Sequence, residues 1–393
     1  MKRLRVAGAR SYVGGIEPSW ADRVEERNAE TKSAGRWRAI RDFDSLGPSG
    51  TLSSGDRRGA EAQPVVSFAS NDYLGLTAHR DVAAAAHQAI DRWGTGSGAS
   101  RLVTGARPVH SELERELADW KGADAALLFP TGFAANLGVI STLAGSGTTV
   151  FSDELNHASI IDGCRLGRAQ VKVYRHRDVE ELDGMLAATS GPSMVVTDTV
   201  FSMDGDEAPV LALAEVCAAH GALLVLDDAH AVMSETEGEL PCDIVRVGTL
   251  SKTLGSLGGF VAGDRPTIDL LVNEARPFIF TTAPSPADTA AALAALRVLR
   301  SSEGEALVGR LRSHVERVAP GNPSPIVPIL IGEEAAAVAA SASLLDRGIF
   351  VPAIRPPTVA PGTSRLRVAL SAAHTDYDVD RLLAGLRGIH ASP

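Results

Sequence analysis

From about residue 65 to about residue 300, short apolar runs alternate with longer amphipathic stretches. Such short runs are typical of strands buried on both faces, and the stretches between them have helical spacing. The strand-like runs are AALLF, TTVFSDE, VKVYR, SMVVTDTV, ALLVLDD, IVRVGTL and GGFVAG. Buried strands alternating with helices predict an α/β fold, with a mainly parallel sheet covered by helices on both faces.

The chain divides into three predicted parts. Residues 1–64 are interpreted as an N-terminal tail and arm, 65–300 as a large domain, and 301–393 as a smaller α+β domain. The last part combines the helix-like stretches GEALVGRLRSHVERV and DYDVDRLLAGLRGI with the strand-like SPIVPILIG and RLRVAL. A chain of 393 residues is long enough for two such cores.

Charge and cysteine content restrict the class of protein. The net charge of -10 argues against a nucleic-acid partner. No apolar run approaches the roughly 18 residues of a membrane span, and the basic start lacks the apolar stretch of a secretory signal. Cys164, Cys217 and Cys242 are odd in number and lack metal-ligand spacing, so we expect reduced thiols in the cytoplasm and no metal.

Polar residues follow one strand-like run abruptly. The apolar residues 222–226 end in Asp227, Asp228, Ala229 and His230. Ligands of open α/β sheets bind beyond the carboxyl ends of the strands. Acids there are equally compatible with a helix cap or a turn, but they would also suit a bound cation such as a protonated pyridine nitrogen.

Lys252 stands in the stretch GTLSKTLGSLGG, in a chain that contains only five lysines. A solvated loop lysine is the ordinary alternative. A reaction that needs a neutral amine would require lysine at this position, because arginine does not lose its proton in proteins. Thr249 and Ser251 add hydroxyl groups, and Gly255 would admit a close backbone approach.

Two further strand ends carry matching residues. Thr131 and Gly132 open a predicted helix, whose first N–H groups favour a phosphate. His157 follows another strand, where its ring could stack on a cofactor or simply begin a helix. Pyridoxal phosphate requires a lysine for its aldehyde, an acid for its ring nitrogen and a phosphate site. The combination predicts that Lys252 forms a Schiff base with this cofactor.

The chain resembles the α-oxoamine synthases, pyridoxal-phosphate enzymes of the aspartate-aminotransferase fold (fold type I). The resemblance covers about residues 67–390. It rests on FASNDYLGL, GTGSGASRLVTG, LFPTGFAANLGV, DELNHASIIDG, VFSMDGDEAPV, LDDAH, TLSKTLGSLGGF, FIFTTAPSP and AIRPPTVAPGTSRLRV. It implies an enzyme that binds pyridoxal 5'-phosphate.

The resemblance assigns roles around the cofactor ring. Lys252 would form the Schiff base and later move the α-proton of the substrate. Asp227 would pair with the pyridine nitrogen and His230 with the phenolic oxygen. His157 would stack on the ring, and Ser202 would bond near the phenolic oxygen.

The resemblance also implies a homodimer with shared active sites. Backbone groups of Gly132 and Phe133 and the Thr249 side chain would hold the phosphate, helped by Thr281 or Thr282 of the partner subunit.

Four residues are assigned to the substrates by the same resemblance. Arg355 would grip the amino-acid carboxylate with its planar fork, and Asn71 and Thr358 would line the substrate side. An N-terminal arginine would meet the acyl substrate; Arg38 and Arg41 both qualify, and we prefer Arg41.

Within the family, the chain is most similar to the members of biotin biosynthesis that condense L-alanine with a pimeloyl thioester and release CO2. Whether coenzyme A or acyl carrier protein carries the acyl group stays open. Glycine-using members, such as 2-amino-3-ketobutyrate ligase, and a catalytically silent subunit are the alternatives; SRLVTG and AIRPPTV favour the alanine user. One departure is Ala231, where the family usually has glycine and a longer glycine-rich loop.

Overall fold

The computed structural model describes residues 18–53, 62–234 and 239–390, and the chain forms two compact units. Of the described residues, the first unit comprises 18–43, 52–53 and 62, and the second comprises 44–51, 63–234 and 239–390. The first contains helix α1 (Trp20–Ser33), which begins with a capping box. Ser19 Oγ accepts the Asp22 N–H at 3.2 Å, and Asp22 Oδ2 accepts the Ser19 N–H at 3.1 Å.

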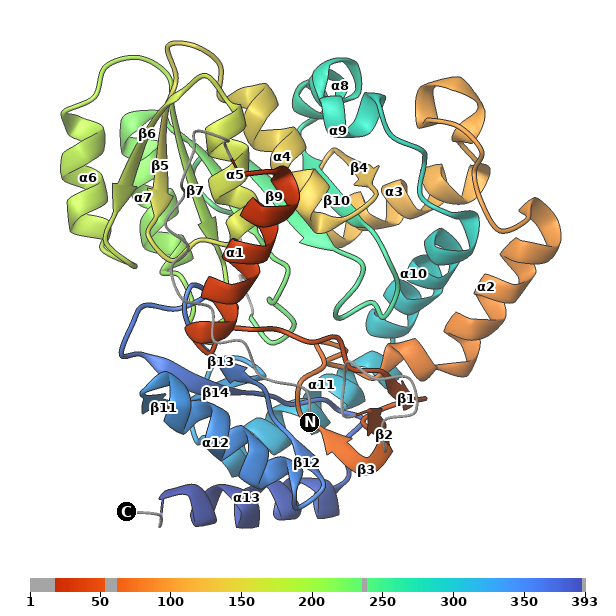
Figure 1. Ribbon diagram of the computed structural model, residues 1–393. Helices are drawn as coiled ribbons and strands as arrows, with labels where there is room; N and C mark the ends of the chain where they lie inside the picture. Colours follow the sequence, from red (N-terminus) through yellow and green to blue (C-terminus); the bar gives the residue numbers. More distant parts are fainter. Residues whose placement is uncertain (1–17, 54–61, 235–238, 391–393) are drawn as a thin grey trace. The chain divides into compact units, whose positions relative to one another are not determined.

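The second unit is built on a seven-stranded sheet of order β4-β10-β9-β8-β7-β5-β6 (Figure 1). Its strands are β4 (Ala125–Phe129), β5 (Thr149–Asp153), β6 (Gln170–Tyr174), β7 (Ser193–Asp198), β8 (Leu223–Asp227), β9 (Ile244–Thr249) and β10 (Gly259–Gly263). β10 is antiparallel to both of its neighbours, and the other strand pairs are parallel. The predicted α/β class, the mainly parallel sheet and all seven strand-like runs are confirmed.

Helices cover both faces of this sheet, as Figure 1 shows. Alternate strand residues point to opposite faces. In β7, Met194 and Val196 pack in one core with α4 (Gly132–Leu143), α5 (Ala158–Leu166), α8 (Arg265–Glu274) and α9 (Arg276–Ile279). Val195, between them, packs with α6 (Val179–Ala187) and α7 (Val210–His220). The sheet is therefore buried on both sides, and its strand ends are the places where polar side chains can face a ligand.

A three-stranded sheet of order β11-β14-β13 lies in the C-terminal part. Its elements are β11 (Ile326–Gly332), β13 (Ala353–Ile354), β14 (Ser364–Ala369), α11 (Ser302–Val318), α12 (Glu334–Leu345) and α13 (Asp376–His390). One hydrophobic core joins α10 (Pro286–Leu299) to residues of α11 and β14. We keep as a proposal that the large and small domains meet near residue 300.

The remaining elements precede or connect these layers. They are β1 (Phe43–Ser45), β2 (Ser49–Ser53), β3 (Ala62–Ser67), η1 (Leu76–Ala78), α2 (Arg80–Trp93), η2 (Arg101–Gly105), α3 (Pro108–Lys121) and β12 (Ile349–Phe350). Within the described residues, no helix combines the length and apolar character needed to span a membrane.

Candidate active site

A cavity of about 230 Å³ opens where β7, β8 and β9 end and α4 begins. Seven of the residues predicted to bind the cofactor line it: Gly132, Phe133, His157, Asp227, His230, Thr249 and Lys252. They come from four separate segments between residues 132 and 252. Because carboxyl ends of parallel strands meet at one edge of a sheet, the fold brings these segments together.

Asp227 is the last residue of β8 and is buried at 6% exposure. Its Oδ2 accepts the Asn136 Nδ2–H at 2.6 Å, and its Oδ1 accepts the Ala229 N–H at 3.0 Å. Asn136 lies on α4, one turn beyond Gly132, and also donates to Ser159 Oγ at 2.9 Å. These bonds fix the carboxylate in the cavity, so that it can meet a cationic nitrogen.

The amine of Lys252 lies in the same cavity. Burial lowers the pKa of Lys252, the charges of Asp227 and Asp198 oppose this change, and Arg367 adds to it. A lowered pKa increases the fraction of neutral amine, which is the form that can react with an aldehyde or accept a proton.

His157 is held by a residue that the sequence analysis missed. Asp198 ends β7 and accepts the His157 N–H through Oδ2 at 2.8 Å. His157 Nδ1 lies 2.7 Å from Ser159 Oγ. Burial lowers the pKa of His157, despite the charge of Asp227, and Lys252 contributes to the decrease. The imidazole is therefore favoured in its neutral form, which suits stacking on an aromatic ring.

The start of α4 forms a cradle for an anion. Thr131 caps the helix by accepting the Ala134 N–H at 3.0 Å, so the N–H groups of Gly132 and Phe133 have no partner within the helix. A Cβ at Gly132 would lie 3.2 Å from Thr249 Cβ, which leaves little room for a side chain. The Thr249 hydroxyl lies 2.8 Å from Ser251 Oγ. Two backbone donors and two hydroxyls thus converge beside the helix N-terminus.

His230 connects the cavity to a buried polar network. The Tyr73 hydroxyl lies 2.5 Å from His230 Nδ1 and 3.1 Å from Asn71 Oδ1. Arg367 donates from Nη2 to Asn71 Oδ1 at 3.1 Å and from Nε to the Ser202 carbonyl at 2.5 Å. The network thus reaches from the cavity through Asn71 to the loop of Ser202.

The protonation of this network follows from its burial. Burial lowers the pKa of His230 well below its ordinary value, and Lys252 and Arg367 add to the effect. Burial also raises the pKa of Tyr73 to about 12, against the charge of Arg367. The raised pKa keeps the Tyr73 hydroxyl protonated, and the lowered pKa favours a neutral His230 imidazole.

The other predicted residues do not line this cavity. Ser202 contributes its carbonyl to Arg367. Thr281 and Thr282 follow α9, and Thr282 is exposed. Arg355 and Thr358 lie in the loop after β13, where the Thr358 N–H bonds the Arg355 carbonyl at 3.1 Å. Arg41 and Arg38 belong to the first unit, and the role of either at the acyl substrate stays a prediction.

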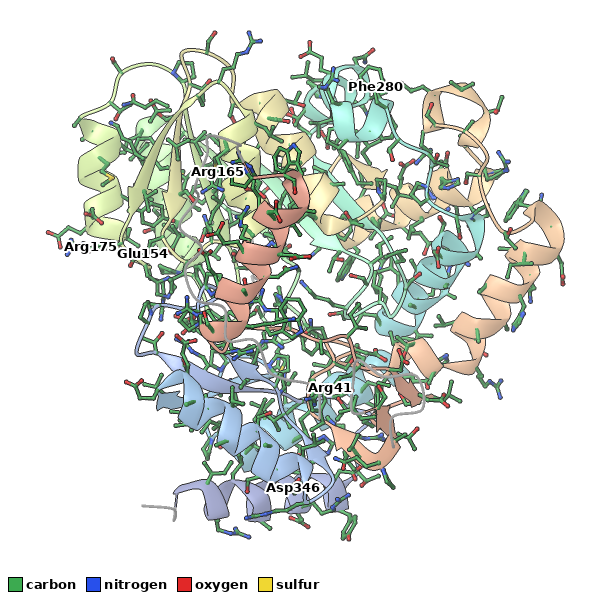
Figure 2. All side chains as sticks on the ribbon, viewed as in Figure 1. Arg41, Glu154, Arg165, Arg175, Phe280 and Asp346 are labelled. Carbon is green, nitrogen blue, oxygen red and sulfur yellow. The ribbon has the colours of Figure 1, made fainter. Side chains whose placement is uncertain are left out.

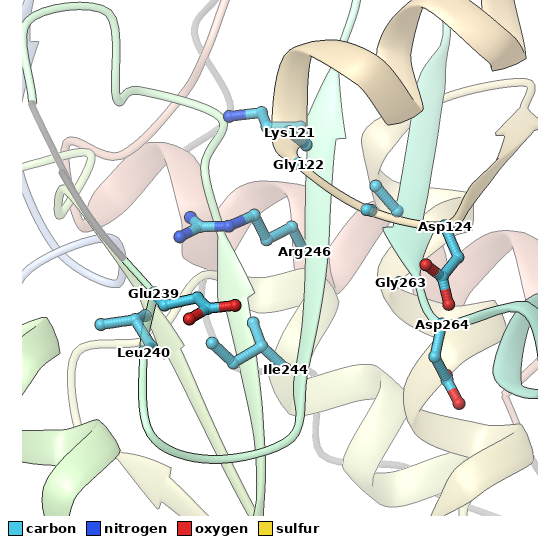
Figure 3. Close-up of a pocket in the computed structure, with 11 residues that line it drawn as sticks. Lys121, Gly122, Asp124, Glu239, Leu240, Ile244, Arg246, Gly263 and Asp264 are labelled. Atoms are coloured by element: carbon cyan, nitrogen blue, oxygen red, sulfur yellow. The ribbon is translucent and has the colours of Figure 1, made fainter.

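Asp228 points away from Asp227 and forms a separate ion cluster. Its carboxylate lies 2.7 Å from Lys121 Nζ and 3.1 Å from an Arg246 nitrogen. Lys121 and Arg246 line a larger cavity of about 470 Å³ near the start of β9 and the end of β10 (Figure 3). Asp228 pairs with both cations, so the Lys121 amine is engaged in a buried ion pair.

The smaller cavity fits pyridoxal phosphate. The amine of Lys252 matches the aldehyde, the buried carboxylate of Asp227 matches the ring nitrogen, and the Gly132 cradle matches the phosphate. Among the described residues, no three or more His, Cys, Asp or Glu side chains form a metal-binding group.

Known proteins resemble this chain over most of its length. The aminotransferase class I and II family matches residues 63–386. The 8-amino-7-oxononanoate synthase of Anaeromyxobacter dehalogenans (strain 2CP-1 / ATCC BAA-258) is 52% identical over 83% of this chain and 86% of its own. That of Marinobacter nauticus is 50% identical over 83% and 88%, respectively.

Solved structures share the fold. The serine palmitoyltransferase (SPT) of Sphingomonas wittichii is 31% identical, with a TM-score of 0.84 over 94% of this chain and 98% of its own. An SPT structure that holds PLP as an internal aldimine is 30% identical, with a TM-score of 0.86 over 95% of this chain and the whole of the other. The fold type I architecture expected from the sequence is confirmed.

Proposed function

Because the chain belongs to the aminotransferase class I and II family, we propose that its reaction is a decarboxylative condensation dependent on pyridoxal phosphate. The substrates are L-alanine and pimeloyl-CoA or pimeloyl-acyl carrier protein, and the product is 8-amino-7-oxononanoate, in biotin biosynthesis. The 52% identity to a relative with that name supports this choice. The observation that carries the chemistry is the single cavity that contains Lys252, Asp227, His157 and the Gly132 cradle.

The cofactor supplies an aldehyde that bonds amines and a ring that withdraws electrons from the substrate α-carbon. Asp227 would keep a proton on the ring nitrogen, because its negatively charged carboxylate is held in place by Asn136 and Ala229. Lys252, with its lowered pKa, takes the α-proton of alanine on Nζ. His230 would pair with the phenolic oxygen of the bound cofactor, while the Tyr73 hydroxyl lies 2.5 Å from its Nδ1.

Two arginines are proposed for the alanine carboxylate. The resemblance suggests Arg355, whereas the geometry favours Arg367. Arg367 is 5% exposed, and its charge acts on both Lys252 and His230. A guanidinium held in place by Asn71 and Ser202 is already oriented for a carboxylate. Asn71 and Thr358 are proposed on the substrate side, and Arg41 at the pimeloyl carboxylate.

A homodimer is part of the proposal. Thr281 and Thr282 do not line the cavity of their own chain, which is what a contribution to the partner's phosphate site would require. Phe280, just before them, is 70% exposed and lies at the surface beyond α9 (Figure 2). Phe133, at the cavity, is 43% exposed, and large apolar side chains exposed near a site are typical of interfaces.

A cytoplasmic location is proposed as well. Cys164, Cys217 and Cys242 are all free in the structure. Free thiols are typical of a reducing compartment.

A thiol-release assay tests the function. Purified protein is given alanine or glycine together with pimeloyl-CoA, pimeloyl-acyl carrier protein or acetyl-CoA. We expect alanine with a pimeloyl thioester to react fastest. Because one methyl group supplies limited discrimination, glycine should react about 10–200-fold more slowly. Faster reaction of glycine with acetyl-CoA would assign the chain to the ketobutyrate-forming members instead.

A further inference from the structure

His176 lies outside the cavity, yet it joins two segments that lead into it. Its Nδ1 lies 3.0 Å from Asp153 Oδ1, and its Nε2 lies 2.8 Å from Asp206 Oδ2. Asp153 ends β5, four residues before His157, and Asp206 follows Ser202 by four residues. One imidazole therefore bridges the segment that presents His157 and the segment that presents Ser202.

The contact with Asp153 fixes the turn before His157. Asp153 Oδ1 also accepts the Leu155 N–H at 2.9 Å, and the Asp153 carbonyl accepts the Asn156 N–H at 3.2 Å. Asn156 donates to the Val196 carbonyl at 2.8 Å, which ties the turn to β7. A shift of the Asp153 carboxylate would thus be transmitted to the backbone that places the His157 ring.

The contact with Asp206 fixes the loop of Ser202. The Phe201 N–H donates to the Asp206 carbonyl at 3.0 Å. The Phe201 ring packs edge-on to the His176 ring, with 4.4 Å between the ring centroids. The carbonyl of the next residue, Ser202, accepts a hydrogen bond from the Nε–H of Arg367. Movement of Asp206 would therefore displace the partner that orients Arg367.

We propose that His176 is a positioning residue, which acts through Asp153 and Asp206 to hold His157 and Arg367 in register with the cofactor. The inference deepens the proposed function and rests on it. The positioning role requires the protonated imidazole of His176, because only that form donates from both ring nitrogens to two carboxylates at once.

The charges around His176 favour this form. Burial opposes protonation, but the hydrogen bonds and charges of Asp153 and Asp206 outweigh burial and raise the pKa of His176 to about 9. Arg177 shares the Asp206 carboxylate at 3.1 Å, so two cations face two anions. Glu154 accepts the His176 backbone N–H at 2.9 Å.

Neighbouring ionisable groups do not replace His176. Burial raises the pKa of Tyr174, the last residue of β6, so its hydroxyl stays neutral. Arg175 extends away from β6 (Figure 2) and pairs with Asp178 and Glu181. Because the pKa of His176 is raised on folding, its contribution to stability is complete below about pH 6.5 and is lost as the pH rises through about 9.

The test uses holoenzyme carrying His176→Gln, Asp206→Asn or both substitutions. His220→Gln is the matched control, because His220 also pairs with a carboxylate, that of Asp183 at 2.7 Å, at the end of α7. The first readout is the visible circular dichroism of the bound cofactor without substrate, which reports the orientation of the ring. The second is the rate of α-proton exchange of alanine.

We expect both variants at the bridge to alter the dichroism and to slow exchange by about 10–100-fold, with the control unchanged. The double variant should be no slower than the slower single variant, because both substitutions break the same His176–Asp206 contact. A wild-type dichroism change near pH 9 should be absent in His176→Gln.

Unaltered dichroism and exchange in a folded His176→Gln protein would overturn the proposal, as would additive losses. If His176→Gln does not fold, the same readouts on Asp206→Asn decide. Neither readout uses an acyl thioester, so a wrong acyl substrate would fail the thiol-release assay and leave these results intact.

Discussion

Asp198 and Asp227 lie directly opposite each other at the carboxyl ends of the neighbouring parallel strands β7 and β8. Burial and the charge of Asp227 raise the pKa of Asp198 well above its ordinary value. Asp198 holds the backbone of His157, while Asp227 faces the cavity from a fixed position. Adjacent strand ends thus give two carboxyl groups different tasks.

Asp227→Asn should slow α-proton exchange, whereas its neighbour Asp228→Asn should lower stability. The first removes the charge that keeps the ring nitrogen protonated, so α-proton exchange of alanine should fall by about 100-fold or more with the fold intact. The second leaves exchange near the wild-type rate. It breaks the buried contacts with Lys121 and Arg246, which should lower the free energy of unfolding by about 3 kcal/mol.

Proton exchange followed by NMR in deuterated water and denaturant unfolding provide the two measurements. Exchange near the wild-type rate in Asp227→Asn, with loss in Asp228→Asn, would reverse the assignment of the two acids.

Arg367→Lys should raise the KM for alanine more than Arg355→Lys does. Lysine keeps the charge but loses the planar fork that bonds Ser202 and Asn71. A hydrogen bond to a charged group is worth about 1.5–3 kcal/mol, which corresponds to a rise of about 10–150-fold. Steady-state kinetics at saturating acyl thioester measure the change. A larger rise of the KM for alanine in Arg355→Lys would assign the alanine carboxylate to Arg355 instead.

Hybrid dimers test whether the sites are shared. Lys252→Ala and Thr282→Val are each expected to be inactive, and activity should partly return when the two proteins exchange subunits. If Thr282 serves the partner, each hybrid contains one site with both lesions and one with neither. Activity that stays absent although mass spectrometry shows mixed dimers would mean that Thr282 does not act across an interface.

The strand ends were predictable because their signal is local. A buried strand is a short apolar run, and the residues after it, such as Asp227 and Lys252, must lie at the sheet edge. Asp198 carries the same signal and was missed because the strand-like run SMVVTDTV was interpreted as continuing to Val200, whereas β7 ends at Asp198. Asn136 was missed because only the first turn of its helix was interpreted, although it lies four residues beyond Gly132.

Arg367 and His176 could not be predicted in this way. Every residue of β14 is buried, so alternation along RLRVAL does not separate an inward arginine from an outward one. The partners of Arg367 are 165 and 296 residues away in the chain. The His176 bridge likewise needs two loops to meet. Such contacts depend on tertiary packing, which the sequence pattern does not report.

Borohydride reduction of the holoenzyme, followed by peptide mapping, tests the central claim most directly. Reduction fixes the cofactor to the lysine with which it forms a Schiff base. We expect the label on Lys252, whose lowered pKa and place in the cavity suit it to this role, and no label in Lys252→Ala. Lys121 is bonded to Asp228 and Lys172 to Thr189, both at 2.7 Å. A label on either of these lysines would contradict the account.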